Sequence, residues 1–146
     1  MRKIVSVLLI VMLVLAVVGV YSSATGSSAS LTGPTTVRAG DTITLTFKVS
    51  GSNIYGVTGT LSYDSNQLTL SSTKQSIASP WMVEFNGNSF VAYDNNLTNP
   101  INSNTSLFTV TFKVNSNLAT GTKVQVSVKN VVTSDGAADS NAGTAT

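Results

Sequence analysis

The sequence predicts an all-β domain, a two-sheet antiparallel β-sandwich that follows an N-terminal apolar leader helix. Apolar and polar residues alternate with a period of two in several segments between residues 42 and 132, as in strands with one buried and one solvated face. Short stretches rich in Gly, Asn and Asp separate these segments, and no helical period occurs beyond the leader. About eight or nine short strands at this spacing favour a sandwich, so we expect residues 30–146 to form one domain.

Residues 1–29 have the layout of a secretory signal peptide followed by a polar linker. A positive start and an apolar run over residues 4–20 precede small-residue cleavage sites that end at Ala24 or Ala29. This layout predicts export and a secreted, extracellular protein. The apolar run is also just long enough to span a bilayer, since about 17 to 20 residues suffice. An uncleaved anchor, with attachment to the membrane at the cell surface, is therefore the alternative.

The composition narrows the chemistry that the chain can perform. It has no cysteine and no histidine, which removes disulfides, thiolate metal sites, the usual general base and the usual zinc ligand. Eight basic residues less Arg2 and Lys3 of the leader leave six, which cancel the six acidic residues. Because no basic patch with interleaved aromatic residues occurs, we expect no nucleic-acid partner. We also expect no enzyme, since scattered carboxylates offer no nucleophile–base pair.

Two strands are predicted before the best-marked corner of the chain. Residues 28–32 suit a short first strand, and residues 42–50 alternate regularly. The inward set of the second segment is Ile43, Leu45, Phe47 and Val49. Each such side chain contributes on the order of 1.5–3 kcal/mol by leaving water. In the absence of a disulfide, these positions must hold the two sheets together.

Residues 54–70 predict a strand, a tight corner with Tyr63 packed against it, and a short second strand. One side of the first strand carries Tyr55, Val57, Gly59, Leu61 and Tyr63, and the other carries Gly56, Thr58, Thr60 and Ser62. The corner is expected at residues 64–66, because Asp, Ser and Asn side chains bond their own backbone. Leu68 and Leu70 resume the alternation, and the Ser/Thr-rich segment from there to Pro80 is predicted to be a loop.

The second half of the chain predicts a hairpin, two further strands and an irregular tail. The hairpin joins Trp81–Asn86 to Ser89–Asp94 across an Asn-Gly turn, which favours positive φ. Residues 106–114 alternate with Phe108, Val110, Phe112 and Val114 inward, and residues 123–132 alternate with Val124, Val126 and Val128. Residues 133–146 have almost nothing to bury, so the last strand is expected to be short or missing. A sandwich without it would expose an edge that can pair with another chain.

Taken in order, these segments resemble a bacterial cohesin domain over about residues 28–146. The matching runs are VRAGDTITLTFKV at residues 37–49, YGVTGTLSYDSNQLTL at 55–70, FVAYD at 90–94, LFTVTFKV at 107–114 and ATGTKVQVSVKNVVTSDG ending at 136. The most specific pieces are the Gly-Asp strand entry and the LSYD corner with a leucine four residues after its aspartate. The resemblance implies a nine-stranded jelly-roll sandwich, similar to family 3 carbohydrate-binding modules. It also implies that the domain binds a calcium-loaded dockerin, as cohesins do in cellulosomes and other assemblies of polysaccharide-degrading enzymes.

The resemblance further implies where a partner would bind. In cohesins, an Asn and an Asp on the third strand hydrogen-bond the dockerin helix, and the matching positions here are Gly56 and Thr58, which carry no charge. A carboxylate at the end of the hairpin is retained. The candidate partner-binding residues are Thr58, Thr60, Ser62, Glu84, Asn86 and Asp94. No catalytic residue, metal ligand or cofactor is expected in this chain, and calcium would belong to the dockerin.

Several of these residues have a second interpretation that the sequence leaves open. Thr58, Thr60 and Ser62 also fit ordinary solvent-facing strand positions, and this is the expected interpretation, because one face of an antiparallel sheet is normally polar. Glu84 and Asp94 could pair as glycosidase carboxylates, although surface placement is expected. Trp81, Phe85 and Tyr93 could stack sugars, but core or corner packing is expected. Asp135, Asp139 and Asn141 could chelate calcium, but their spacing misses the EF-hand pattern, so a solvated loop is expected.

Two alternative functions also remain at this stage. One is a carbohydrate-binding module on the same fold, with a polysaccharide as its partner. The other is a structural surface or adhesin domain, which would self-associate or stay in the cell wall rather than bind a soluble partner.

Overall fold

The computed structural model describes residues 26–146 and holds nine β-strands in that part of the chain. The strands are β1 (Ser28–Thr32), β2 (Thr42–Ser50), β3 (Gly56–Tyr63), β4 (Leu68–Gln75), β5 (Trp81–Asn86), β6 (Ser89–Asp94), β7 (Thr105–Val114), β8 (Val126–Ser134) and β9 (Asp139–Ala145). The predicted all-β sandwich is confirmed. The predicted signal peptide or anchor falls on residues that lie outside the described part. Within residues 26–146, no helix has the length and apolar character needed to cross a membrane.

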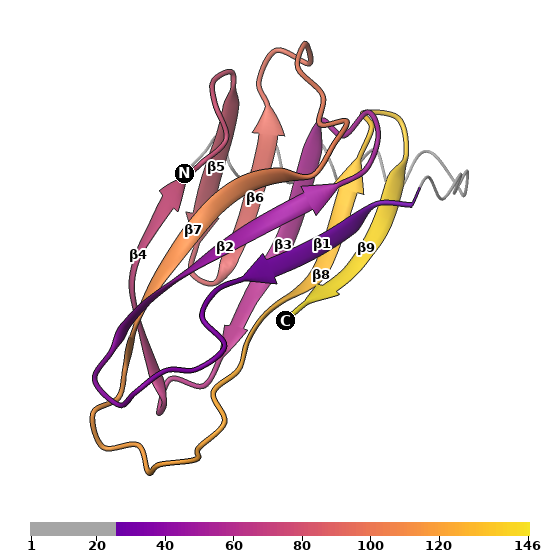
Figure 1. Cartoon of the computed structure of the whole chain (residues 1–146). Coiled ribbons are helices and arrows are strands. Elements are labelled where there is room, and N and C mark those ends of the chain that lie inside the picture. Colours follow the sequence, from indigo (N-terminus) through magenta and orange to yellow (C-terminus); the bar gives the residue numbers. More distant parts are fainter. Residues whose placement is uncertain (1–25) are drawn as a thin grey trace.

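The nine strands form two antiparallel sheets packed face to face, as Figure 1 shows. The four-stranded sheet has the order β1-β2-β7-β4, and the five-stranded sheet has the order β5-β6-β3-β8-β9. The connections β2–β3, β3–β4 and β4–β5 each carry the chain from one sheet to the other, and so do β6–β7 and β7–β8. Strands that are neighbours in a sheet are therefore often distant in the sequence.

Side chains from the inner faces of both sheets fill the interior. The inward sets predicted for β2 and β7 are confirmed, because all eight of those residues are buried. Phe47 stacks on Phe108 with ring centroids 5.0 Å apart and meets the edge of Phe90 at 5.4 Å. Phe90 and Phe108 are in turn 4.8 Å apart. In the described part of the chain, the buried core residues all lie between residues 43 and 145, so residues 26–146 contain the whole of this cluster.

Gly59 makes room for this aromatic cluster at the middle of β3. A Cβ atom at Gly59 would lie 2.8 Å from Phe90 Cε1 and 3.1 Å from Val128 Cγ1, and Phe90 is held by the rings around it. Gly59→Ala is therefore expected to destabilise the domain by about 1–3 kcal/mol through overpacking. The measurement is urea denaturation of residues 26–146.

Gly56→Ala, on the same strand, is the matched control for Gly59→Ala. A Cβ atom there would meet nothing closer than Ser134 Cβ at 3.8 Å, so its stability should change by less than about 1 kcal/mol. Equal effects of the two substitutions would contradict the packing argument.

The predicted corner and hairpin are both confirmed. Asp64 Oδ1 accepts the Asn66 N–H at 2.8 Å, and the Asp64 carbonyl accepts the Leu68 N–H at 2.9 Å. The Tyr63 ring packs edge-on against Phe112 at 4.8 Å. The β5–β6 turn places Gly87 at a φ of 60°, the left-handed conformation that its Asn-Gly sequence favours.

Three sequence predictions about strand extent are wrong. Residues 71–75 are not a loop, because β4 continues to Gln75 and pairs with β7 up to Phe108. Strand β8 begins at Val126 rather than at residue 123 and runs on to Ser134. The tail is neither irregular nor missing its strand, since Asp139–Ala145 pairs with β8. Strands β4 and β9 lie at sheet edges, where backbone pairing on one side holds strands whose side chains remain exposed.

Candidate partner-binding site

The outer face of the five-stranded sheet is the candidate site. Its strands are paired so that side chains lie in rows that cross four or five strands. The first row is Met82, Tyr93, Gly56, Ser134 and Asp139, and the second is Glu84, Val91, Thr58, Val132 and Asn141. A third row contains Asn86, Ser89, Thr60 and Lys129. We use "the outer face" for these three rows together with Ser62 and Ser127.

Five of the six residues singled out from the sequence lie on the outer face. Thr58 is half-buried between Val91 and Val132 at the centre of the second row. Thr60 and Ser62 continue along β3, and the β5 edge supplies the other two, Glu84 and Asn86. The structure therefore brings these five side chains to one surface, while it leaves their role in binding to be tested.

The sixth residue, Asp94, occupies an inward position and is 2% exposed. Its Oδ1 atom accepts the Asn96 N–H at 3.0 Å, and its Oδ2 atom accepts the N–H groups of Thr98, at 2.7 Å, and of Asn99. The Trp81 indole donates to the Asn99 carbonyl at 2.8 Å. Asp94 therefore holds the β6–β7 loop in place from inside and does not present its carboxylate to a partner.

The surroundings of Asp94 also shift its titration. Burial by itself raises the pKa of this carboxyl, but the backbone N–H groups of Asn99, Asn96 and Thr98 outweigh burial and hold the pKa below its ordinary value. The lowered pKa keeps the Asp94 carboxylate ionised, and both of its oxygens accept hydrogen bonds from the backbone of the loop. The glycosidase pair considered for Glu84 and Asp94 does not assemble, because the Asp94 oxygens already accept backbone donors.

Glu84 is paired with a neighbour on the outer face. The Tyr93 hydroxyl donates to Glu84 Oε1 at 3.1 Å, which links the first two rows across β5 and β6. Burial raises the pKa of the Tyr93 phenol, and the hydrogen bond to Glu84 and the charge of that carboxylate raise it further. Tyr93 therefore stays a neutral donor over the physiological range.

A small depression lies at the centre of the outer face. It has a volume of about 30 Å³ and is lined by side chains of four strands, among them Thr58, Val91, Tyr93, Val132 and Asp139. The sequence interpretation missed Val91, Val132 and Asp139 as site residues. Alternation marks which residues of a strand share a face, but only the pairing of β9 with β8, and of β8 with β3, brings Asp139 into the row that contains Ser134 and Gly56.

The aromatic residues do not form a sugar-binding platform. Trp81 is 3% exposed, and Phe85 packs against Phe108 with ring centroids 5.0 Å apart. Both therefore pack in the core, as expected from the sequence. Among residues 26–146, Tyr93 is the one aromatic residue that the rows of the outer face contain.

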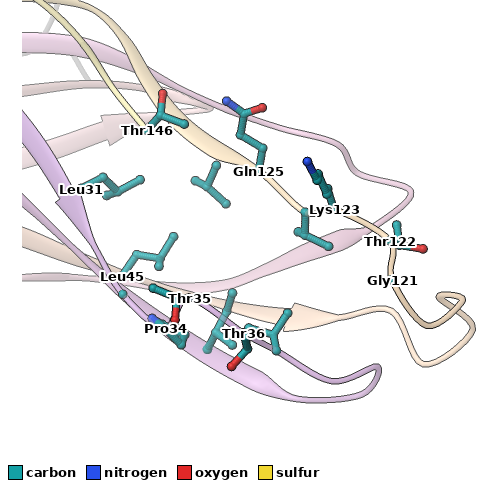
Figure 2. Close-up of a pocket in the computed structure, with 15 residues that line it drawn as sticks. Leu31, Pro34, Thr35, Thr36, Leu45, Gly121, Thr122, Lys123, Gln125 and Thr146 are labelled. Atoms are coloured by element: carbon teal, nitrogen blue, oxygen red, sulfur yellow. The ribbon is translucent and has the colours of Figure 1, made fainter.

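A larger hollow lies elsewhere, at the end of the sandwich where the β1–β2 and β7–β8 loops meet. This groove has a volume of about 650 Å³. Figure 2 shows Leu31 and Leu45 on one wall and Lys123, Gln125 and Thr146 around the other. None of the described side chains along its walls is acidic, and Lys123 is the one basic side chain among them. In the described part of the chain, no three acidic residues come together as a metal site would require.

Comparison with known proteins agrees with this architecture. A family model described as "Cohesin domain" matches residues 27–146, whereas no curated protein matches the chain. A cohesin module from a family 33 glycoside hydrolase of Clostridium perfringens superposes with a TM-score of 0.67 at 9% identity, over 81% of this chain and 90% of that one.

Two further solved structures share the fold. A type III cohesin module from the ScaE cell-surface anchoring scaffoldin of Ruminococcus flavefaciens gives a TM-score of 0.57 at 18% identity, over 76% of this chain and 71% of that one. A non-cellulosomal cohesin from the archaeon Archaeoglobus fulgidus gives 0.51 at 20% identity, over 73% and 77%. Because the family model covers nearly all of the described residues, the chain belongs to the cohesin domain family.

Proposed function

We propose that this protein is an exported, non-catalytic binding module whose outer face docks a dockerin-type partner in an extracellular assembly. Such an assembly would degrade polysaccharides or organise proteins at the cell surface. Membership of the cohesin domain family is the observation that carries the proposal. The calcium in this scheme belongs to the dockerin rather than to this chain.

The character of the outer face supports a protein partner. The middle of the face, at Thr58 and Thr60, offers hydroxyl groups that can both donate and accept hydrogen bonds. Both residues lie on β3, which is paired with a neighbouring strand on each side. Met82 is 44% exposed at one end of the first row and adds apolar contact. A face of paired strands whose depression measures only about 30 Å³ suits a docked helix better than a small molecule, which needs a deep pocket.

Residues 26–146, immobilised and presented with a panel of calcium-loaded dockerins, should retain at least one of them and release it on addition of EDTA. Thr58→Arg should weaken that retention about tenfold or more, because a bulky cation then stands at the centre of the face. Thr44→Arg, on the outer side of the four-stranded sheet, is the matched control and should bind normally. Melting temperatures of both variants check that the fold is intact.

Further measurements on residues 26–146 distinguish dockerin binding from the two alternative functions. No calcium-dependent retention of any dockerin would contradict the dockerin proposal. Retarded migration in affinity electrophoresis on cellulose, xylan or chitin would favour a carbohydrate-binding module instead. Self-association in sedimentation, or retention on cell walls without a soluble partner, would favour a structural surface domain.

A further inference from the structure

The side-chain amide of Gln75 reaches from the end of β4 to the backbone of β5. Its Nε2 group donates to the Trp81 carbonyl at 2.8 Å, and its Oε1 atom accepts the Val83 N–H at 3.0 Å. Nε2 also donates to the Ile77 carbonyl at 2.8 Å. Both amide hydrogens and the amide oxygen are therefore in use, which fixes the position of the amide although Gln75 is an exposed residue.

These bonds fall on an edge of the five-stranded sheet that no strand of the described chain covers. Strand β5 is the outermost strand of that sheet, and it lies on the same side of the sandwich as β4, the outermost strand of the other sheet (Figure 1). The two-residue turn of the hairpin makes Asn86 and Ser89 a hydrogen-bonded pair. Because bonded and non-bonded positions alternate along the ladder, Trp81, Val83 and Phe85 turn their N–H and C=O groups outward.

The Gln75 amide stands where one residue of an added strand would stand. In a parallel ladder, each such residue bonds the two neighbours of the residue that it faces. A residue opposite Met82 would thus donate to the Trp81 carbonyl and accept the Val83 N–H, and Gln75 makes those same two bonds. The Trp81 N–H is occupied as well, by the Ala78 carbonyl at 3.2 Å. The first half of the β5 edge is therefore already paired within the domain.

Without this amide, β5 has the features of a strand that pairs with another chain. An edge strand presents a row of backbone donors and acceptors that a further strand can bond. The segment WMVEFN contains four large apolar side chains and a single charge, and Met82 is 44% exposed. A second copy of β5 fits this edge, since an antiparallel pair centred on Val83 sets Met82 opposite Glu84 and keeps the two glutamates apart.

We propose that Gln75 is an edge cap, a side chain that keeps the β5 edge from pairing with β5 of a second copy. The cap holds the domain as a monomer and leaves the β5 end of the outer face, with Met82 and Glu84, clear for a partner. Displacement of this one side chain opens the edge, so that two copies join their five-stranded sheets into one continuous sheet. The inference does not depend on which partner the outer face binds.

Sedimentation velocity of residues 26–146, which contain the whole core cluster, tests the cap in a Gln75→Met variant. Methionine has nearly the length of glutamine but makes none of the three hydrogen bonds. The parent should sediment as a monomer, whereas Gln75→Met should form a dimer as its concentration rises. Gln125→Met makes the same replacement at an exposed glutamine before β8 and should stay monomeric. A Gln75→Met protein that associates no more than the parent or than Gln125→Met would overturn the proposal.

A second substitution assigns the contact between copies to β5. Val83→Pro removes the N–H that faces the edge, and proline is tolerated on an edge strand where its nitrogen faces outward. The combined variant Gln75→Met, Val83→Pro should therefore return to the monomer. A dimer that persists in the combined variant would show that the copies meet elsewhere, which is also incompatible with an edge cap.

Hydrogen exchange tests the cap in the parent protein itself, independently of how well any variant folds. The Val83 amide, which donates to Gln75, should exchange about tenfold or more slowly than the next outward amide, that of Phe85, after correction for intrinsic rates. In dilute Gln75→Met, the two amides should exchange at similar rates, and both should slow as the dimer forms. Similar rates for Val83 and Phe85 in the parent would contradict the cap.

Discussion

Replacing Phe47 by aspartate is expected to unfold the domain. The Phe47 side chain is fully buried and contacts the rings of Phe90 and Phe108 from the opposite sheet and from its own. Loss of a buried phenylalanine costs about 3–5 kcal/mol, and an unpaired buried carboxylate adds several kcal/mol more. The sum is comparable to the total stability of a domain of this size, about 5–15 kcal/mol. Near-ultraviolet circular dichroism and amide signal dispersion should both be lost.

Two further substitutions on β2 distinguish the loss of core packing from a general effect of mutation. Phe47→Leu keeps an apolar side chain at the same place and should retain a cooperative melt. Thr42→Asp introduces the same carboxylate at an exposed position of the same strand and should change stability by no more than about 0.5 kcal/mol. A folded Phe47→Asp protein would show that the two sheets do not depend on this contact.

Replacing Asp94 by asparagine is expected to cost about 2–4 kcal/mol, because an amide group offers one acceptor where the carboxylate offers two. Three backbone N–H groups of the β6–β7 loop then compete for one oxygen and meet the new NH₂ group. The melting temperature should fall by about 10 °C. Asp135→Asn should leave it nearly unchanged, and an equal fall in both variants would contradict the buried role of Asp94.

The depressed pKa of Asp94 gives this prediction a pH dependence with a definite sign. A carboxyl whose pKa is lower in the folded than in the unfolded chain contributes stability that is fully present above its ordinary pKa, about 4. That contribution is lost as the pH falls through the lowered value. Denaturation measured between pH 7 and pH 2 should therefore show the parent and the Asp94→Asn variant converging in stability at the acidic end. A constant difference at all pH values would contradict the linkage.

Local patterns in the sequence were enough to predict the elements that form the core. The Asn-Gly turn of the hairpin and the Asp-Ser-Asn corner depend on residues that are neighbours in the chain. The inward side of β2 was also predictable, because alternation with a period of two is a property of one strand alone. The edge strands β4 and β9 were missed for the converse reason, since their side chains remain largely exposed and carry no alternating signal.

By itself, the sequence determined the fold class, the buried faces of the central strands and which five candidate residues share the outer face. Only the tertiary structure decided that Asp94 faces inward as the anchor of a loop, and that Asp139 stands in a row with Gly56 and Tyr93. The physical reason is that alternation specifies a face within a strand, whereas the rows of the site depend on register between strands far apart in the chain. That register is decided by cross-strand packing of both sheets at once.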